Sequence, residues 1–203
     1  MKKAIKTQIK DPELIRQKHL QIAKIASKLF IKKGYANTSM REISKATGIT
    51  IGNLYDYITK KEDVLYLVFD AFYSTWTKNL DKHGVFTIED PLEQLRTALR
   101  KMLELVHEYR DMALLMYRES MHLPKRILKE ILHKETGFVE CFEMILKRGV
   151  EKKVFNIKDP FFVANMIAYQ IAFEALRGWS LRRKYTDEEI IDYIEEIVLR
   201  SVL

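Results

Sequence analysis

Signals that begin α-helices recur along the whole chain. Three segments carry Ser or Thr followed three residues later by Glu: Ser39–Glu42, Thr59–Glu62 and Thr186–Glu189. In this pattern the hydroxyl accepts from an unpaired N–H while the Glu bonds back to the cap. Asp90-Pro91 and Asp159-Pro160 add a capping carboxylate before a proline at the first helical position. Only 7 Gly and 4 Pro interrupt the 203 residues, and no stretch alternates as a strand does. The sequence therefore predicts an all-α fold.

These start signals, with Gly34, Gly48 and Gly149 as stops, predict about nine helices. The predicted ranges are 12–33, 40–47, 51–57, 60–82, 91–108, 111–121, 125–152, 159–182 and 187–201. The first helices are basic, whereas the later ones have broad apolar faces. We therefore expect an N-terminal domain over residues 1–61 and a helical bundle over residues 62–203, with the boundary inside the fourth helix near Glu62.

Positive charge is concentrated in the first third of the chain. Residues 1–63 hold 14 Lys and Arg against 6 Asp and Glu, while the remaining 140 residues hold 21 against 22. Phosphate backbones attract such a segment through counterion release; a solvated basic face without a partner is the alternative. No apolar run approaches the roughly 18 residues of a membrane span, and none follows the first lysines as in a signal peptide. The lone Cys141 fits a reducing compartment. We expect a cytoplasmic protein with no membrane partner.

Two short helices joined by a tight turn are predicted within residues 40–57. Gly48 supplies the positive φ that a short turn between crossed helices needs, and Thr50 caps the helix that follows. The inward side of this unit is predicted to carry apolar residues: Ile43, Ala46, Ile49, Leu54 and Ile58. The opposite side is left with Gly52, Asn53, Asp56 and Tyr57. This arrangement is typical of a helix-turn-helix.

The run from Arg41 to Ile58 resembles the DNA-binding signature of the tetracycline-repressor (TetR) family. The flanks match as well, with Ala26–Phe30 before Gly34-Tyr35 and Lys60–Asp63 after. The close resemblance covers about residues 18–66. It implies a three-helix DNA-binding domain, a third helix in the major groove of double-stranded DNA, and a function in transcription regulation.

The resemblance implies base contacts from the third helix. The expected positions are Ile51, Gly52, Asn53 and Asp56. Asn53 both donates and accepts, with adenine as its preferred partner. Ile51 either meets a thymine methyl group or belongs to the core, and Asp56 either accepts from cytosine or pairs with Lys60.

Phosphate contacts are expected around this helix. They are assigned to Thr38, Ser39, Thr50, Tyr55, Tyr57 and Lys61. Tyr55 has an alternative, because it could pack beside Leu54. The segment Lys2–Lys10 is either an arm that reaches the minor groove or a solvated tail.

The predicted bundle is dense in aromatic residues and Met, which suit adaptable apolar cavities as well as ordinary cores. By resemblance it is expected to hold a small hydrophobic ligand, and the selected lining residues are Phe72, Trp76, Met102, Val106, Met116, Phe142, Tyr169 and Phe173. The last two helices are expected to form a homodimer interface that presents two recognition helices to a palindromic operator. The apolar residues assigned to that interface are Ile167, Ile171, Phe173, Ala175, Ile190, Ile191, Ile194, Ile197 and Val198.

One pattern favours a different class of protein. Glu104–His107 and Glu119–His122 both read Glu-x-x-His, the ligand spacing of di-iron bundles such as ferritin-like oxidases. Such a site needs two further Glu, and surface or polar positions for both His explain the pattern equally well. No catalytic triad, phosphate loop or CxxC is present in the sequence, so we expect no enzyme, no cofactor and no metal. The expected function is a repressor released from DNA by its ligand, with an activator of the same architecture as the alternative.

Overall fold

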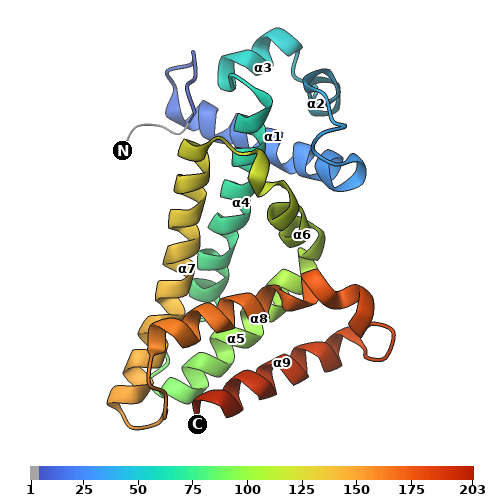
Figure 1. Cartoon of the computed structure of the whole chain (residues 1–203). Helices are drawn as coiled ribbons and strands as arrows, with labels where there is room; N and C mark the ends of the chain where they lie inside the picture. Colours follow the sequence, from blue (N-terminus) through green and yellow to red (C-terminus); the bar gives the residue numbers. More distant parts are fainter. Residues whose placement is uncertain (1–4) are drawn as a thin grey trace. The chain divides into compact units, whose positions relative to one another are not determined.

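The computed structural model describes residues 5–203 as nine α-helices and two short 3-10 helices, without strands in that range. The elements are α1 Pro12–Lys33, α2 Met40–Thr47, α3 Ile51–Tyr57, α4 Lys61–Lys82, η1 Val85–Thr87, α5 Pro91–Glu108, α6 Arg110–Glu119, η2 Ser120–His122, α7 Lys125–Glu151, α8 Pro160–Leu181 and α9 Asp187–Val202 (Figure 1). The predicted all-α class is confirmed, and no described helix is long and apolar enough to cross a membrane.

The chain divides into two compact units. The first runs through Ser74 and adds Leu115–His133; the second combines Thr75–Leu114 with Lys134–Leu203. Helices α4, α6 and α7 each contribute residues to both units. The functional division of the chain at residues 61 and 62 stays a prediction.

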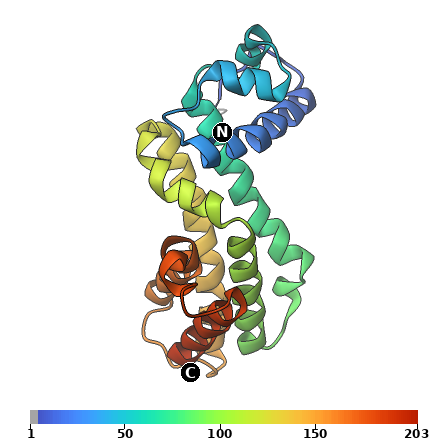
Figure 2. The same cartoon turned by 90° about the vertical axis from the view of Figure 1, so that its right-hand side faces the viewer.

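Helices α1, α2 and α3 share one small core in the first unit, and both views show them grouped together (Figures 1 and 2). Helix α1 begins where the Asp11 carboxylate accepts from the N–H groups of Glu13 and Leu14. The core side chains are almost wholly buried: Ile22, Ala26, Phe30, Ile43, Leu54 and Ile58. Ala46 was predicted to join them but is exposed, and Thr47 is buried in its place.

Capping boxes open α2 and α9 as predicted. The third predicted box, Thr59–Glu62, is wrong. Because α4 begins at Lys61, the third helical residue is Asp63. One Asp63 oxygen accepts from the Thr59 N–H at 2.8 Å, the Thr59 hydroxyl at 2.6 Å and the Lys60 N–H at 3.1 Å. The side chain of a single buried residue therefore fixes the link between α3 and α4.

Helix α5 is the centre of the second unit, because it packs against both α8 and α9 (Figures 1 and 2). Arg148 of α7 is also tied to the segment before α5, donating to the carbonyl oxygens of Ile88 at 2.9 Å and Glu89 at 2.7 Å. Gly149 was considered as a stop signal, but α7 continues past it and ends within one residue of the predicted end at residue 152. The helix runs to Glu151, and Lys153 takes the left-handed conformation with φ 59°.

Candidate DNA-binding site

The turn between α2 and α3 is held by its own side chains. Gly48 ends α2 in the left-handed region with φ 71°, which favours glycine there. The Ser44 hydroxyl donates to the Ile49 carbonyl oxygen at 2.6 Å, and the Thr50 hydroxyl accepts from the Asn53 N–H at 3.3 Å. The predicted turn and cap are therefore present, and they fix the angle at which α3 leaves α2.

Helix α1 holds the ends of the other two helices. His19 Nε2 donates to the carbonyl oxygen of Tyr57 at 2.9 Å, and the Gln21 side chain donates to that of Thr47, also at 2.9 Å. Both carbonyls belong to last helical turns, where intrahelical donors are lacking. Sequence reasoning missed these two residues because the groups they bond lie 38 and 26 positions away.

The outer side of α3 carries most of the predicted base-reading positions. Gly52 and Asn53 are exposed, whereas Leu54 and Ile58 are fully buried on the opposite side. Ile51 is 40% exposed and Tyr55 42% exposed, so neither belongs to the core. This placement favours DNA contact over packing for Ile51 and Tyr55.

Asp56 is half-buried on the same helix. Within residues 5–203 it forms no ion pair with Lys60. Its carbonyl oxygen instead accepts from the N–H of Gln8 at 2.8 Å. The predicted contact of Asp56 with cytosine stays a prediction.

The predicted phosphate-contact residues fall into two groups. Ser39 and Thr50 are exposed helix caps. Thr38 is only 1% exposed and donates its hydroxyl to the Gly34 carbonyl oxygen at 2.9 Å, while Tyr57 is also buried. Tyr57 was predicted by helical spacing to project from the outer side of α3, and Thr38 was expected to contact phosphate, but both side chains pack inward. A phosphate contact from either would require that packing to open.

Lys61 lies against the segment that follows α1. Its Nζ donates to the Ala36 carbonyl oxygen at 3.2 Å and sits 4.3 Å from the centre of the Tyr35 ring. Burial lowers the pKa of Lys61, with nearby carboxylates acting in the opposite direction. Its predicted phosphate contact therefore competes with an internal cation–π contact.

Over residues 5–10 the basic N-terminal segment is attached to the helix-turn-helix, which argues against a solvated tail there. Ile5 is buried, and the Gln8 N–H bonds to α3. Lys6 and Lys10 are exposed beside this attachment. Lys2 and Lys3 lie outside the described residues. One apolar side chain and one backbone hydrogen bond therefore attach residues 5–10 to the helix-turn-helix, and a contact of this segment with the minor groove stays a prediction.

The residues predicted to line a ligand cavity are divided between the two units, and a cavity formed by them stays a prediction. Met102, Val106 and Phe142 are buried in the second unit. Trp76 and Phe142 both contact Phe138, with ring centres 5.3 and 5.2 Å apart. Phe173 is half-buried in the same unit, and Phe72 and Met116 belong to the first unit. Tyr169 is 56% exposed, which argues against a place inside a cavity.

Helices α8 and α9, together with Leu203 directly after α9, carry many exposed apolar side chains. The large ones that are about half exposed or more are Phe161, Phe162, Met166, Tyr169, Trp179, Tyr193, Ile197 and Leu203. We call these eight residues the α8–α9 face. Of the interface residues predicted from sequence, Ile197 is in this face, whereas Ile167, Ile171, Ile190, Ile191, Ile194 and Val198 are buried within the chain. The predicted helices carry an interface-like surface, but most of the predicted residues point inward because α5 already covers that side.

The two Glu-x-x-His segments do not come together as a four-ligand site. Glu104 pairs with Lys101 at 2.7 Å, and His107 faces Glu174 and Asp187. Glu119 pairs with His122 at 3.3 Å in the first unit. Because each motif has its own partners, the structure does not favour the di-iron alternative.

Proteins similar to this chain match it over nearly its whole length. HTH-type transcriptional regulator HbdR of Aromatoleum sp. (strain CIB) is 24% identical over 209 residues, covering 98% of this chain and 85% of that protein. The structure of AibR in complex with isovaleryl coenzyme A and operator DNA has a TM-score of 0.76 at 22% identity, covering 91% of this chain and 99% of AibR. FadR from Bacillus subtilis in complex with stearoyl-CoA has a TM-score of 0.78 at 18% identity, covering 91% of this chain and all of FadR.

A helix-turn-helix with an exposed third helix, joined to a larger helical unit, defines the chain as a DNA-binding transcription regulator. Residues 22–66 match the description "Bacterial regulatory proteins, tetR family", and residues 89–202 match "Tetracyclin repressor-like, C-terminal domain". The chain belongs to the TetR family.

Proposed function

We propose that this regulator is a repressor that binds a palindromic operator as a homodimer and leaves it when a hydrophobic ligand of the acyl class binds. The proposal rests on the exposure of side chains on the outer side of α3. Asn53 and Gly52 are exposed there while Leu54 and Ile58 anchor the helix from below. A major groove admits such a helix, and Asn is a side chain that reads base edges.

The homodimer rests on the α8–α9 face. Monomeric proteins rarely leave so many large apolar side chains exposed on neighbouring helices. Trp179 is 67% exposed and Phe162 63% exposed, and a second copy of the same face would cover both. A two-fold pairing of this kind repeats α3 about an axis, which requires an operator with matching symmetry.

The ligand class is supported by the chain and by its structural neighbours. Trp76, Phe138 and Phe142 form a continuous aromatic cluster, and apolar side chains of this kind favour an apolar ligand. AibR and FadR were solved with acyl-CoA molecules bound. A CoA-like head group would also need basic residues near the ligand, for which the candidates are Arg118, Arg177, Arg182 and Arg183. Of these, Arg182 is already paired with Glu174 and Asp187.

A contact inside the first unit offers a path from ligand to DNA. The His122 ring of η2 stacks on Tyr35, with ring centres 5.5 Å apart, and Tyr35 lies two residues after the end of α1. The Lys61 Nζ also lies over the Tyr35 ring. Burial, followed by the nearby carboxylates, raises the pKa of Tyr35 to about 12. A shift of η2 would therefore move the segment that supports α2 and the start of α4.

The DNA contact is tested with Asn53→Ala on a duplex that the wild-type chain binds. We expect a loss of about 1–3 kcal/mol in binding free energy and relaxed preference at one base pair, measured by fluorescence anisotropy. Asn156→Ala is the matched control, because Asn156 is exposed in the second unit. Equal affinities of wild type and Asn53→Ala would remove the base-reading role.

The ligand and the sign of regulation need separate experiments. Native mass spectrometry of the protein purified from its host should reveal a hydrophobic acyl compound, which should then release DNA. A small polar effector, such as a sugar phosphate, would contradict the proposed ligand class. Deleting the gene should raise a reporter driven by the operator; a fall in the reporter would identify an activator instead.

A further inference from the structure

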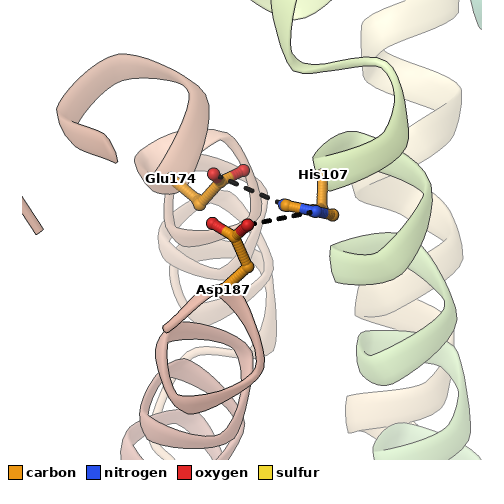
Figure 3. A group of neighbouring side chains, drawn as sticks. All are labelled: His107, Glu174 and Asp187. Carbon is orange, nitrogen blue, oxygen red and sulfur yellow. Dashed lines mark ion pairs between the residues drawn. The ribbon is translucent and has the colours of Figure 1, made fainter. Parts of the chain in front are cut away.

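Three helices of the second unit bring one imidazole and two carboxylates together. His107 of α5 points between Glu174 of α8 and Asp187, the first residue of α9 (Figure 3). Nδ1 of His107 lies 3.5 Å from Glu174 Oε1, and Nε2 lies 3.8 Å from Asp187 Oδ2. One ligand atom from each residue lies within 4.8 Å of the others. The function proposed above makes no use of this group.

Glu174 is the buried member of the group. It is 3% exposed; its Oε1 meets the Arg182 guanidinium, whereas its Oε2 accepts no hydrogen bond within the described part of the chain. Nδ1 of His107 is buried without a hydrogen bond as well. A buried carboxylate is costly unless a cation compensates it. The cluster is therefore built around a positive charge.

In this structure the positive charge comes from Arg182, the residue that ends α8. Its guanidinium forms ion pairs with Glu174 and with Asp187, the latter at 2.8 Å. Gly178 provides the space, because a Cβ there would lie 2.3 Å from an Arg182 nitrogen. The Arg182 side chain is 32% exposed and long enough to turn into solvent. His107 and Asp187 are also partly exposed, so small ions reach the cluster.

We propose that His107, Glu174 and Asp187 bind one divalent transition-metal ion of the Zn²⁺ type, which replaces the Arg182 guanidinium. Zn²⁺ takes imidazole nitrogen and carboxylate oxygen at about 2.0–2.2 Å, so the three ligand atoms close in by small side-chain rotations. Imidazole also suits Co²⁺ and Ni²⁺. Metal binding joins the first turn of α9 to α5 and α8, and thereby stiffens the two helices that carry the α8–α9 face.

Cobalt titration of the full-length chain tests this site, because the visible absorption of Co²⁺ reports its ligands. We expect one Co²⁺ per chain, displaced by Zn²⁺. His107→Ala should weaken binding by more than about 10-fold, since loss of even an outer-shell partner has effects of that size. Asp187→Asn should also weaken binding and removes less of the structure. His83→Ala is the control, because His83 is an exposed histidine of the same unit.

The variant Arg182→Ala distinguishes a metal-binding site from an ion cluster that serves only to stabilise the fold. If the guanidinium competes with the metal, this variant binds Co²⁺ more tightly than wild type and regains thermal stability when Zn²⁺ is added. The proposal is overturned if neither wild type nor Arg182→Ala binds Co²⁺. It is equally overturned if His107→Ala and Asp187→Asn, both folded by circular dichroism, bind as wild type does.

Discussion

Asp63→Ala tests how the structure fixes the start of α4. The change removes one acceptor that serves three donors, namely the Thr59 N–H, the Thr59 hydroxyl and the Lys60 N–H. Hydrogen bonds to a charged group contribute about 1.5–3 kcal/mol each. The three contributions are not additive, because the bonds share one oxygen. We therefore expect the free energy of unfolding to fall by about 2–4 kcal/mol. For a chain of this length that corresponds to a fall in Tm of roughly 4–16 °C.

Glu62→Ala is the matched control for this prediction. Glu62 is the acceptor that the sequence pattern predicts, yet it is partly exposed and does not cap the helix. We expect its removal to change stability by less than about 0.5 kcal/mol. Thermal unfolding of both variants followed by far-UV circular dichroism decides the matter. A large loss for Glu62→Ala together with a small loss for Asp63→Ala would refute the reasoning from structure.

Three further predictions use other parts of the chain. Gly149→Ala should lower the free energy of unfolding in urea by about 1–3 kcal/mol, because its Cβ would lie 1.9 Å from the Phe155 ring. On the same helix, the Cβ of Gly137→Ala meets no atom within 4 Å, so this variant should gain about 0.5–1 kcal/mol. Similar effects of both changes would contradict this prediction. Cys141 should resist alkylation near neutral pH until the chain unfolds, because burial raises its pKa to about 11; rapid labelling of the folded protein would show the thiol to be accessible. The hydrogen bond from Lys33, followed by those from Ser39, lowers the pKa of Glu42 from 4.5 to about 2. The stabilising effect of the Glu42 carboxylate is therefore full above pH 4.5 and is lost as the pH falls toward 2. Glu42→Gln should flatten the pH dependence of stability in that window, and an unchanged dependence would count against the bond to Lys33.

Local signals predicted the helices well, because the groups involved lie within a few residues of each other. The predicted bounds of α2 and α3 match the structure, since Ser39, Gly48 and Thr50 act on their own neighbours. At the start of α4 the capping pattern predicted Glu62 as the acceptor, whereas the structure has Asp63, one residue later. A capping pattern names the residue types but does not fix the residue at which the helix begins.

Contacts between segments far apart in the chain could not be predicted from the sequence. Periodicity showed that α8 and α9 are apolar, but not which side α5 covers, and so most of the predicted interface residues turned out to be buried within the chain. The cluster of His107, Glu174 and Asp187 joins positions up to 80 residues apart, and no local pattern links them. The attachment of Gln8 to Asp56 escaped prediction for the same reason.

Selection of bound duplexes from a random pool, with wild type and Asn53→Ala in parallel, tests the central claim most directly. The account predicts that wild type enriches a palindrome of two equivalent half-sites, because two copies of α3 are presented about a two-fold axis. It predicts that Asn53→Ala enriches the same palindrome with preference lost at one symmetric base pair in each half-site. Enrichment of a site without two-fold symmetry, or identical motifs for both proteins, would contradict the assignment of α3 as the element that reads the DNA.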